Sequence, residues 1–525
     1  MDVKEVERYC CVVQLSEDLK KPVSCSGVVV HPQTGAVICT GVPFSRFMTD
    51  KEPLSSDQRL LSPRSFSQRL KIRLSFPAEP HLDFSSLPPS RGKSARQREV
   101  SAELLMLVNC LEFRRAFQAL FQDADQWCFH GDEEDEELMR DARFLSWFAV
   151  LKASVMEDSS PGQGAVPWQK SSSLQKGRPV VACGSPFGSL CMDLFISTLS
   201  RGIISNLAGE DNAIILTDAR CLPGTEGGGV FAVRGLGDVR LIGLIVSPFG
   251  WKANEWIGLT LVCSIHSVFR SITRCMGAQD PLWDVWLHPA EAGLHMCTTA
   301  QESRAVKYPT VCHVDSGHFW GSGVVVTDRL VVTCRHVVNG KSVVTLKFHH
   351  RDRVQDVVGD VLFSTKESSP YDLALVQLRN STSEAAVPRM AQSFHSGDSV
   401  VVVGYGGLGR RCGPSLTCGV LSKAISLNNQ PVMLQTTCAV QAGASGGAVV
   451  RTHSGELLGI VSSNTRDMAA EVTYPHLNFS IPVTVFQGLL QHFHQTRDVS
   501  VFRVLDTTGE EIRRVWRLQG AQSKL

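Results

Sequence analysis

The sequence predicts an all-β protein built from two similar halves. Most of its apolar segments are short, rich in β-branched residues and bounded by Gly, Pro, Asn or Asp, which is the pattern of strands joined by turns. The same segments return in the same order in the second half of the chain. Helical periodicity is found mainly in residues 104–121 and 485–493. These observations favour a sandwich or barrel architecture that occurs twice.

The repeat is carried by short motifs at matching places in the two halves. The matched pairs are residues 26–30 and 322–326, 36–39 and 331–334, 180–184 and 401–404, 199–205 and 416–422, 224–228 and 443–447, and 241–247 and 457–462. A repeated order of this kind indicates a duplicated domain. A chain of 525 residues is also too long for one ordinary hydrophobic core.

The composition excludes several classes of protein. A formal net charge of +1, with 20% charged residues, argues against binding to nucleic acid. No apolar run approaches the roughly 20 residues needed to span a bilayer, so no membrane insertion is expected. The 17 cysteines are odd in number and include no Cys-x-x-Cys pair, so we expect mostly reduced, buried thiols and no metal site.

A glycine-rich turn in the second half has the pattern expected around a nucleophile. The turn Gly443-Ala444-Ser445-Gly446-Gly447 contains the glycines that a tight backbone reversal needs. Hydrolysis of an amide by serine requires a nucleophile and donors for the developing oxyanion. We expect Ser445 to be the nucleophile, and the N–H groups of Gly443 and Ser445 to form the oxyanion hole.

A histidine and an aspartate precede this turn in suitable contexts. His336 follows the apolar segment 330–334, and Asp372 opens the apolar run 373–376. A carboxylate at the entrance to such a run is costly to bury without a partner, and a histidine N–H is a suitable one. We expect His336 to be the general base and Asp372 to orient it. The order His, Asp, Ser is that of chymotrypsin.

Each of these residues also has a simpler interpretation when it is taken alone, as a loop turn, a structural histidine or a turn aspartate. Their order within a β-rich repeat favours the catalytic interpretation. Cys334, close to the base, suggests a thiol nucleophile instead. Cys39 holds the matching place in the first half, so a small residue that packs the strand explains both cysteines more simply.

Four segments of the second half form a recognisable set: residues 321–326, 332–338, 371–375 and 443–447. They resemble the corresponding motifs of trypsin-like proteases of the Deg/HtrA type. The resemblance implies a chymotrypsin/trypsin-like double β-barrel and a serine endopeptidase without a cofactor. The PDZ module of typical Deg proteases is missing.

The first half lacks the catalytic residues. Gly41 stands near the histidine position, Trp147 near the aspartate position, and Glu226 at the serine position. A carboxylate cannot replace the serine hydroxyl as the acyl nucleophile here. We interpret this half as a degenerate copy of the protease that supports, positions or regulates the active one.

These interpretations give a domain plan. We expect a degenerate trypsin-like copy over residues 1–279, a linker over 280–300, the catalytic copy over 301–495, and a tail over 496–525. Two stretches of the first copy are expected as insertions outside the barrels: a Ser/Pro/Arg-rich stretch between Leu60 and Ser101, and the acidic run Asp132 to Glu137.

Specificity is predicted from the surroundings of Ser445. Ala439 takes the place where trypsin carries its pocket aspartate, so a basic residue at the cleavage site is disfavoured. A modest, uncharged pocket walled by Val461, Ser462 and Ser463 suits a small or cysteine side chain.

The last three residues, Ser523, Lys524 and Leu525, form a tripeptide read by the peroxisomal import receptor. We therefore expect import into the peroxisomal matrix, with that receptor as a partner. Together with the duplicated layout, the resemblance implies removal of N-terminal leader peptides from imported proteins. It also implies processing of other peroxisomal enzymes, including those of fatty-acid β-oxidation.

The resemblance further implies self-cleavage into two fragments, which would be partners of one another. The suggested region is Asn109-Cys110-Leu111, with Cys110 and Leu111 as the candidate residues and the position of the bond left open. Formation of a homo-oligomer is left open. Two other functions also stay open: a catalytically silent scaffold that binds peroxisomal proteins, and a general quality-control protease.

Overall fold

The structure is a computed structural model of the chain. It describes residues 3–18, 21–49, 55, 57–77, 98–121, 127–128, 143–154, 165–187, 195–234, 238–248, 251–252, 255–256, 258–276, 308–349, 353–382, 385–406, 412–467, 472–507 and 509–516. The expected linker, the acidic run and the terminal Ser523, Lys524 and Leu525 lie outside the described residues. The chain divides into two compact units: the first comprises residues 1–250 and 259–300, and the second residues 251–258 and 301–525.

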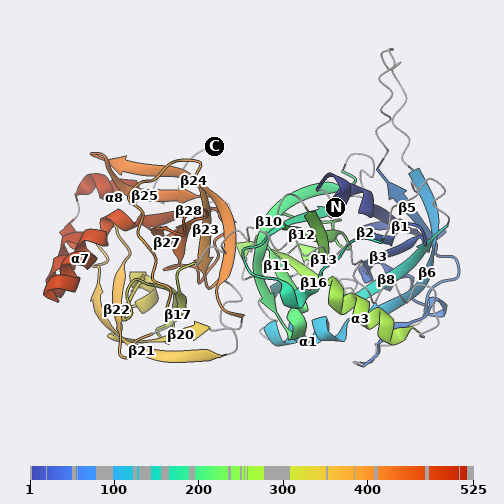
Figure 1. The fold of residues 1–525 in the computed structure, drawn as a ribbon, viewed down its shortest axis with the longest axis horizontal. Helices are drawn as coiled ribbons and strands as arrows, with labels where there is room; N and C mark the ends of the chain where they lie inside the picture. The colour runs from blue at the N-terminus through green and yellow to red at the C-terminus, as the bar shows by residue number, and fades with distance from the viewer. Residues whose placement is uncertain are drawn as a thin grey trace, which may run out of the picture. The chain divides into compact units, whose positions relative to one another are not determined.

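Two closed six-stranded barrels form most of the second unit (Figure 1). The first barrel follows the order β17 (Val311–Asp315), β18 (Trp320–Val325), β19 (Leu330–Thr333), β22 (Ala374–Leu378), β21 (Val354–Ser364) and β20 (Val343–His349). The second follows the order β23 (Ser399–Gly404), β24 (Ser415–Leu427), β25 (Gln430–Thr436), β28 (Val472–Pro482), β27 (Leu457–Asp467) and β26 (Ala448–Arg451).

The strands of the first unit have the same arrangement. Its first sheet follows the order β4 (Leu60–Leu61), β6 (Arg98–Asn109), β5 (Lys71–Phe76), β1 (Cys10–Ser16), β2 (Val23–His31), β3 (Ala36–Thr40) and β8 (Trp147–Ala153), and pairing of β6 with β8 closes the ring. Its second barrel follows the order β10 (Thr198–Ala208), β11 (Ile214–Thr217), β16 (Thr260–Ser264), β13 (Asp238–Pro248), β12 (Gly229–Arg234) and β9 (Pro179–Gly184). The predicted all-β, duplicated double-barrel fold is therefore confirmed.

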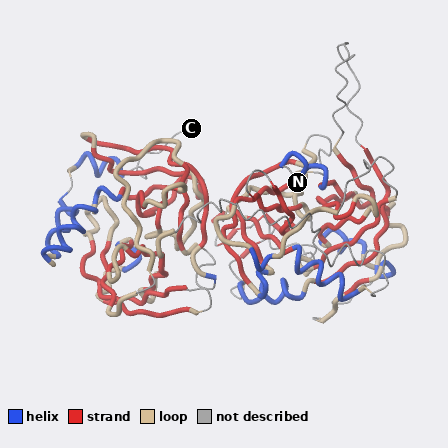
Figure 2. The backbone as a smooth tube through the Cα atoms, in the orientation of Figure 1, coloured by secondary structure: helices blue, strands red, loops and turns tan. Residues whose placement is uncertain are grey.

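Helices are short and few beside the strands in both units (Figure 2). In the first unit they are η1 (Val3–Tyr9), η2 (Val42–Phe47), η3 (Pro63–Ser65), α1 (Leu111–Leu120), η5 (Ser171–Ser173), η6 (Glu210–Asn212) and α3 (Ile265–Cys275). In the second they are α5 (Arg335–Val338), η7 (Val483–Val485), α7 (Gln487–Thr496), η8 (Val499–Thr507) and α8 (Glu510–Trp516). The two-residue strands β7 (Trp127–Cys128), β14 (Trp251–Lys252) and β15 (Glu255–Trp256) complete the described elements.

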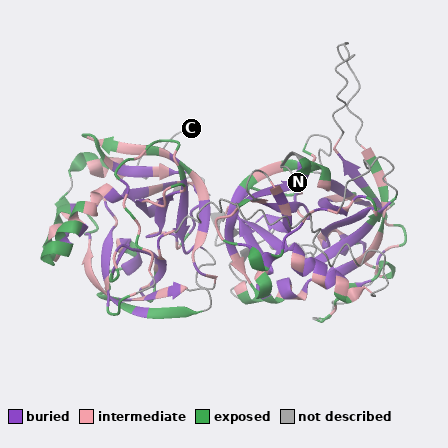
Figure 3. Cartoon of the chain, in the orientation of Figure 1, coloured by how far each residue is buried: buried purple, intermediate pink, exposed green. Residues whose placement is uncertain are grey.

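The barrel interiors are filled by the β-branched residues that made the strands recognisable in the sequence. Figure 3 shows the buried positions concentrated on the barrel strands of each unit. Val314, Val331 and Val376 are among the fully buried residues of the first barrel of the second unit. Among the described residues the cysteine thiols form no disulfide, and most are buried. No helix in the described part of the chain is long and apolar enough to cross a membrane.

Part of the stretch interpreted as an insertion belongs to the barrel. Strands β5 and β6 are two of the six strands of the ring, although β5 lies wholly between Leu60 and Ser101 and β6 begins there. In β5 the burial alternates from Lys71 to Leu74, as expected for a strand with one face on the core. The Ser, Pro and Arg residues that suggested a loop lie on both sides of β5, and those in residues 78–97 fall outside the described residues.

The expected tail also contributes to the second unit. Phe502 and Leu505 of η8 are buried, and the ring of Phe502 stacks on that of Phe363 at a centroid distance of 5.5 Å. The hydroxyl of Ser369 donates to the carbonyl of Leu505 at 2.8 Å. Helix η8 is thus a packed element of the protease unit, because its apolar side chains Phe502 and Leu505 are buried there.

Candidate active site

The turn around Ser445 depends on glycine at two positions. Gly443 and Gly446 have φ values of +92° and +85°, which other residues rarely adopt. A Cβ atom on Gly443 would lie 2.2 Å from the ring of Trp320 and 2.4 Å from the carbonyl oxygen of Tyr405. The backbone at Gly443 therefore approaches its neighbours more closely than any side chain allows.

Ser322 of β18 holds this turn in place. Its hydroxyl donates to the carbonyl of Gly443 at 2.8 Å and accepts from the N–H of Tyr405 at 2.8 Å. Its own N–H donates to the carbonyl of Ser445 at 2.8 Å. Among the described residues, the N–H groups of Gly443 and Ser445 have no acceptor. Two backbone donors beside Ser445 are thus available to stabilise an oxyanion.

His336 and Asp372 are in direct contact. Nδ1 of His336 forms a short hydrogen bond with Oδ2 of Asp372, and Oδ1 accepts from the backbone N–H of His336 at 3.0 Å. Arg335 lies 3.8 Å from the same carboxylate. Burial alone would raise the pKa of Asp372, but the hydrogen bonds and charge of His336 lower it below its usual value. Asp372 therefore stays ionised near neutral pH and orients the imidazole, leaving Nε2 for the substrate side.

The Ser445 turn and the segment that carries His336 both form hydrogen bonds to strand β27. The N–H of Gly446 donates to the carbonyl of Val461 at 2.7 Å, and the thiol of Cys334 donates to the same carbonyl at 3.2 Å. The hydroxyl of Ser445 itself donates to the carbonyl of Ser462 at 3.3 Å, and within the described residues it has no hydrogen bond to His336. Catalytic hydrogen bonds are often formed only when substrate is bound, so this rotamer is compatible with a catalytic role of Ser445.

Cys334 is close to the His336–Asp372 pair but is a poor nucleophile. The ligand atoms of Cys334, His336 and Asp372 lie within 4.8 Å of one another, a spacing that a metal ion could use. The thiol is fully buried, and burial raises its pKa well above the usual value. A protonated thiol neither attacks a carbonyl nor binds a metal strongly.

The strand register corrects the alignment of Cys334 with the first half. β2 pairs Gly27 with Cys39, and β18 pairs Gly323 with Thr333. Cys39 is therefore the equivalent of Thr333, one residue earlier than expected. The two short runs are both apolar, so the sequence alone could not distinguish registers that differ by one residue.

The proposed specificity residues occupy two segments. Val461, Ser462 and Ser463 lie on β27, and the carbonyls of Val461 and Ser462 contact the Ser445 turn as described. Ala439 is buried after the end of β25, and its carbonyl accepts from the hydroxyl of Thr417 at 2.7 Å. A small, uncharged pocket remains a prediction from these positions.

The first unit retains the scaffold of this site. The hydroxyl of Ser26 donates to the carbonyl of Gly224 at 2.8 Å and accepts from the N–H of Ser185 at 2.8 Å. The N–H of Ser26 donates to the carbonyl of Glu226 at 2.9 Å. Each of these bonds has its counterpart at Ser322. The strand pairing also identifies the residue equivalent to Asp372. Because β3 pairs Cys39 with Ala149 as β19 pairs Thr333 with Ala374, Trp147 holds the place of Asp372, two residues before the paired alanine.

Glu226 fills the position that the oxyanion hole would leave open. One of its carboxylate oxygens accepts from the N–H of Gly224, the equivalent of Gly443, at 2.7 Å. Burial raises the pKa of Glu226, although the N–H groups of Glu226 and Gly224 act to lower it. The degenerate turn therefore provides its own acceptor where a substrate oxygen would bind.

The Cys110–Leu111 bond lies where β6 ends and α1 begins. Cys110 is fully buried, and its N–H donates to the carbonyl of Ser146 at 2.8 Å. Its carbonyl accepts from the N–H of Arg114 at 3.0 Å. Cleavage at this bond therefore requires the strand–helix junction to open locally, because a protease binds its substrate in an extended conformation.

Ser322 was not predicted as a site residue. The sequence contained a signal for it, because Ser26-Gly27 and Ser322-Gly323 begin matching motifs in the two halves. A polar residue at the start of an otherwise apolar, repeated segment indicates a buried hydrogen bond. The signal gives no partner, since Gly443 and Tyr405 are remote in sequence.

Comparison with known proteins gives matches over the whole chain. The trypsin-like peptidase domain family matches residues 130–244 and 321–460. A human protein named peroxisomal leader peptide-processing protease is 40% identical over 98% of this chain and 97% of its own length. The mouse protein of the same name is 39% identical over 100% and 98%. The periplasmic serine endoprotease DegP of Salmonella typhimurium is 30% identical over 32% of this chain and 34% of its own length.

Ser322→Ala and Ser26→Ala form a matched pair of variants. Each removes the same two hydrogen bonds, so each should lower the free energy of unfolding by about 1–3 kcal/mol. Ser322→Ala should also slow labelling of the protein by a fluorophosphonate roughly 10- to 100-fold, because the turn that holds Ser445 is misplaced. Ser26→Ala should label at the wild-type rate. Equal labelling rates for the two variants would contradict a specific role of Ser322 in the site.

Glu226→Gln should change how stability depends on pH. In the wild type the unfolded chain loses the Glu226 proton near pH 4.5, whereas the folded chain keeps it to higher pH. The free energy of unfolding should therefore decline as pH rises through this interval. The variant cannot ionise, so its stability relative to wild type should increase with pH.

Urea unfolding of both proteins across this interval measures the effect. Glu103→Gln, at an exposed position of β6, is the control and should follow the wild-type curve. A Glu226→Gln curve parallel to that of the wild type would show that ionisation of Glu226 does not change the free energy of unfolding.

Proposed function

Because the chain belongs to the family of peroxisomal leader peptide-processing proteases, we propose that it removes N-terminal leader peptides from imported peroxisomal proteins with Ser445 as its nucleophile. The chain is a peroxisomal serine endopeptidase of the trypsin-like type. The observation that supports the assignment of residues is the contact between His336 and Asp372, in the unit whose Ser445 turn has two backbone donors without an acceptor.

The proposed reaction follows from these positions. Nε2 of His336 takes the proton from the hydroxyl of Ser445 as the oxygen attacks the scissile carbonyl. The N–H groups of Gly443 and Ser445 stabilise the oxyanion, and the imidazolium returns its proton to the leaving amine. Water then hydrolyses the acyl-enzyme by the same route. The ionised Asp372 stabilises the imidazolium and keeps Nδ1 protonated throughout.

The proposed substrates are proteins that carry a small or cysteine side chain before the cleaved bond. The support is the alanine at position 439, where a buried acid would be needed to attract a basic side chain. Enzymes of fatty-acid β-oxidation are included in the proposal. The import receptor that reads Ser523, Lys524 and Leu525 is the proposed partner for entry into the matrix.

Self-cleavage at the Cys110–Leu111 bond is also part of the proposal. Cleavage would divide the closed ring of the first unit into two pieces: β1 to β6 on one fragment and β8 on the other. The backbone ladders of β3 with β8 and of β6 with β8 cross that division. The fragments should therefore stay together after cleavage.

Ser445→Ala and Asp372→Asn test the assignment of the active site. A precursor with an N-terminal leader should be cut once by the wild type and not at all by Ser445→Ala. Asp372→Asn should fold normally and lose about 10⁴-fold in rate, because the imidazole is no longer held in the required tautomer. Sequencing the new N-terminus of the product and timing its appearance provide the measurement.

The other functions predict different results. A ladder of products from unfolded casein, with no discrete cut in the precursor, would favour a quality-control protease. Equal fluorophosphonate labelling of the wild type and Ser445→Ala would favour a silent scaffold and remove Ser445 from the mechanism. Glu226→Gln is a suitable control, because it changes the equivalent position in the degenerate unit.

Cleavage between Cys110 and Leu111 should leave the two fragments in one particle. Size-exclusion chromatography of the cleaved protein should give a single peak containing both fragments, and only denaturant should separate them. A recognition sequence for an added protease, inserted after Cys110, allows the same measurement in a Ser445→Ala background. Two separate peaks without denaturant would show that the strand ladders do not hold the fragments.

A further inference from the structure

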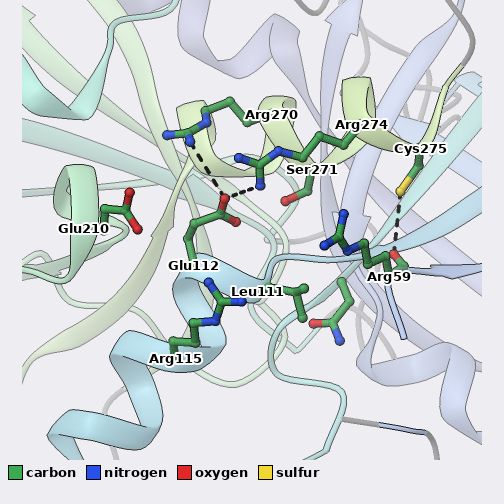
Figure 4. A pocket seen from close by; sticks show the side chains of 10 residues that line it. Arg59, Leu111, Glu112, Arg115, Glu210, Arg270, Ser271, Arg274 and Cys275 are labelled. Atoms are coloured by element: carbon green, nitrogen blue, oxygen red, sulfur yellow. Dashed lines mark hydrogen bonds and ion pairs between the residues drawn. The ribbon is translucent and has the colours of Figure 1, made fainter. Parts of the chain in front are cut away.

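A cavity of about 290 Å³ lies in the first unit, on the face formed by α1 and α3. Figure 4 shows its polar side chains grouped around Glu112. It is lined by Arg59, Asn109, Leu111, Glu112, Arg115, Glu210, Arg270, Ser271, Arg274 and Cys275. A volume of this order suits a small ligand.

The lining carries an excess of positive charge, since four arginines face two glutamates. Two of the arginines have acidic partners: Arg274 pairs with Glu112, and Arg270 pairs with Asp211 at 2.5 Å. Among the described residues, Arg59 and Arg115 have no ion pair or hydrogen bond from their guanidinium groups. The guanidinium groups of Arg59 and Arg115 are therefore available to pair with the oxygen atoms of a ligand.

Glu112 indicates that the ligand must also donate a hydrogen bond. Its exposed fraction is 7%, and one carboxylate oxygen is held by Arg274 while the other, Oε2, is buried without a hydrogen bond within the described residues. Burial alone would raise the pKa of Glu112, but its backbone N–H and Arg274 lower it below its usual value. An ionised, buried oxygen without a donor calls for one from a ligand or ion.

We propose that this cavity binds a protonated phosphate group, either free or as a small phosphomonoester. Arg59 and Arg115, together with Arg274, pair with the phosphate oxygens, and the remaining P–OH donates to Oε2 of Glu112. A fully ionised anion such as sulfate satisfies the arginines but brings no proton for Glu112. The site should therefore distinguish phosphate from sulfate, although their size and shape are alike.

Calorimetric titration of the full chain in a Ser445→Ala background tests the proposal. Near neutral pH, inorganic phosphate should bind saturably at one site per chain, and sulfate at least about tenfold more weakly, because only phosphate satisfies the buried oxygen. Glycerol phosphate is the third ligand. Tighter binding than inorganic phosphate would assign the cavity to a monoester, and weaker binding would assign it to the free ion.

Two sets of variants separate the parts of the site. Arg59→Gln/Arg115→Gln changes two exposed side chains and should weaken phosphate binding about tenfold or more. Arg201→Gln, which removes one positive charge on β10 outside the cavity, is the control and should bind as the wild type does. Glu112→Gln offers an amide donor as well as an acceptor, so it should lose the preference for phosphate over sulfate.

The results that would overturn the proposal are equally specific. They are an absence of saturable phosphate binding, equal affinity for phosphate and sulfate in the wild type, or unchanged affinity in Arg59→Gln/Arg115→Gln. If Glu112→Gln fails to fold because Arg274 loses its partner, the double arginine variant and the sulfate titration still decide the matter. None of these measurements depends on proteolytic activity.

Discussion

The hydroxyl of Ser322 joins two parts of the protease unit that must be held together for catalysis. Ser322 belongs to the first barrel, whereas Gly443 and Tyr405, its two partners, belong to the second barrel and its adjoining segments. His336 follows a strand of the first barrel, and Ser445 precedes a strand of the second. Any change in the contact between the barrels would therefore alter the distance between His336 and Ser445, the proposed base and nucleophile. A buried hydroxyl with both donor and acceptor satisfied gives this contact a definite geometry.

The degenerate unit shows that this geometry does not depend on the reaction. Ser26 makes the same bonds as Ser322, although Trp147 and Glu226 replace the orienting acid and the nucleophile. The turn at Gly224 would still leave an N–H without an acceptor if a small residue stood at position 226. The carboxylate of Glu226 removes that deficit, since an unpaired buried donor costs free energy. The first unit, which lacks the proposed triad, thus has a residue that satisfies the turn internally.

The sequence predicted the barrels for physical reasons, and it supplied the proposed triad from residue context. Alternating β-branched strands and repeated glycine turns are local features, and His336, Asp372 and Ser445 each occur in a strand or turn context that fits one role. The register of Cys39 could not be derived, because adjacent apolar residues are interchangeable until a ladder fixes them. Strand β5 was interpreted as part of an insertion because the neighbouring Ser, Pro and Arg residues dominate the local composition. The cavity around Glu112 was not predicted, since it combines side chains as remote as Arg59 and Arg274.

Glu112, which is buried, and Glu226, which is partly buried, are stabilised in different ways in the first unit. Glu226 has only backbone N–H groups as partners, so burial dominates and raises its pKa. At Glu112 the backbone N–H and the neighbouring arginines lower the pKa, so this carboxyl group stays ionised although it is buried. An ionised buried acid is stable only while its cations stay in place, which ties α1 to α3. The same helix α1 begins at Leu111, beside the proposed self-cleavage bond. The ion pairs between α1 and α3 therefore lie beside the bond whose local opening the proposed self-cleavage requires. In the turn at Glu226, by contrast, the carboxyl group already occupies the N–H of Gly224.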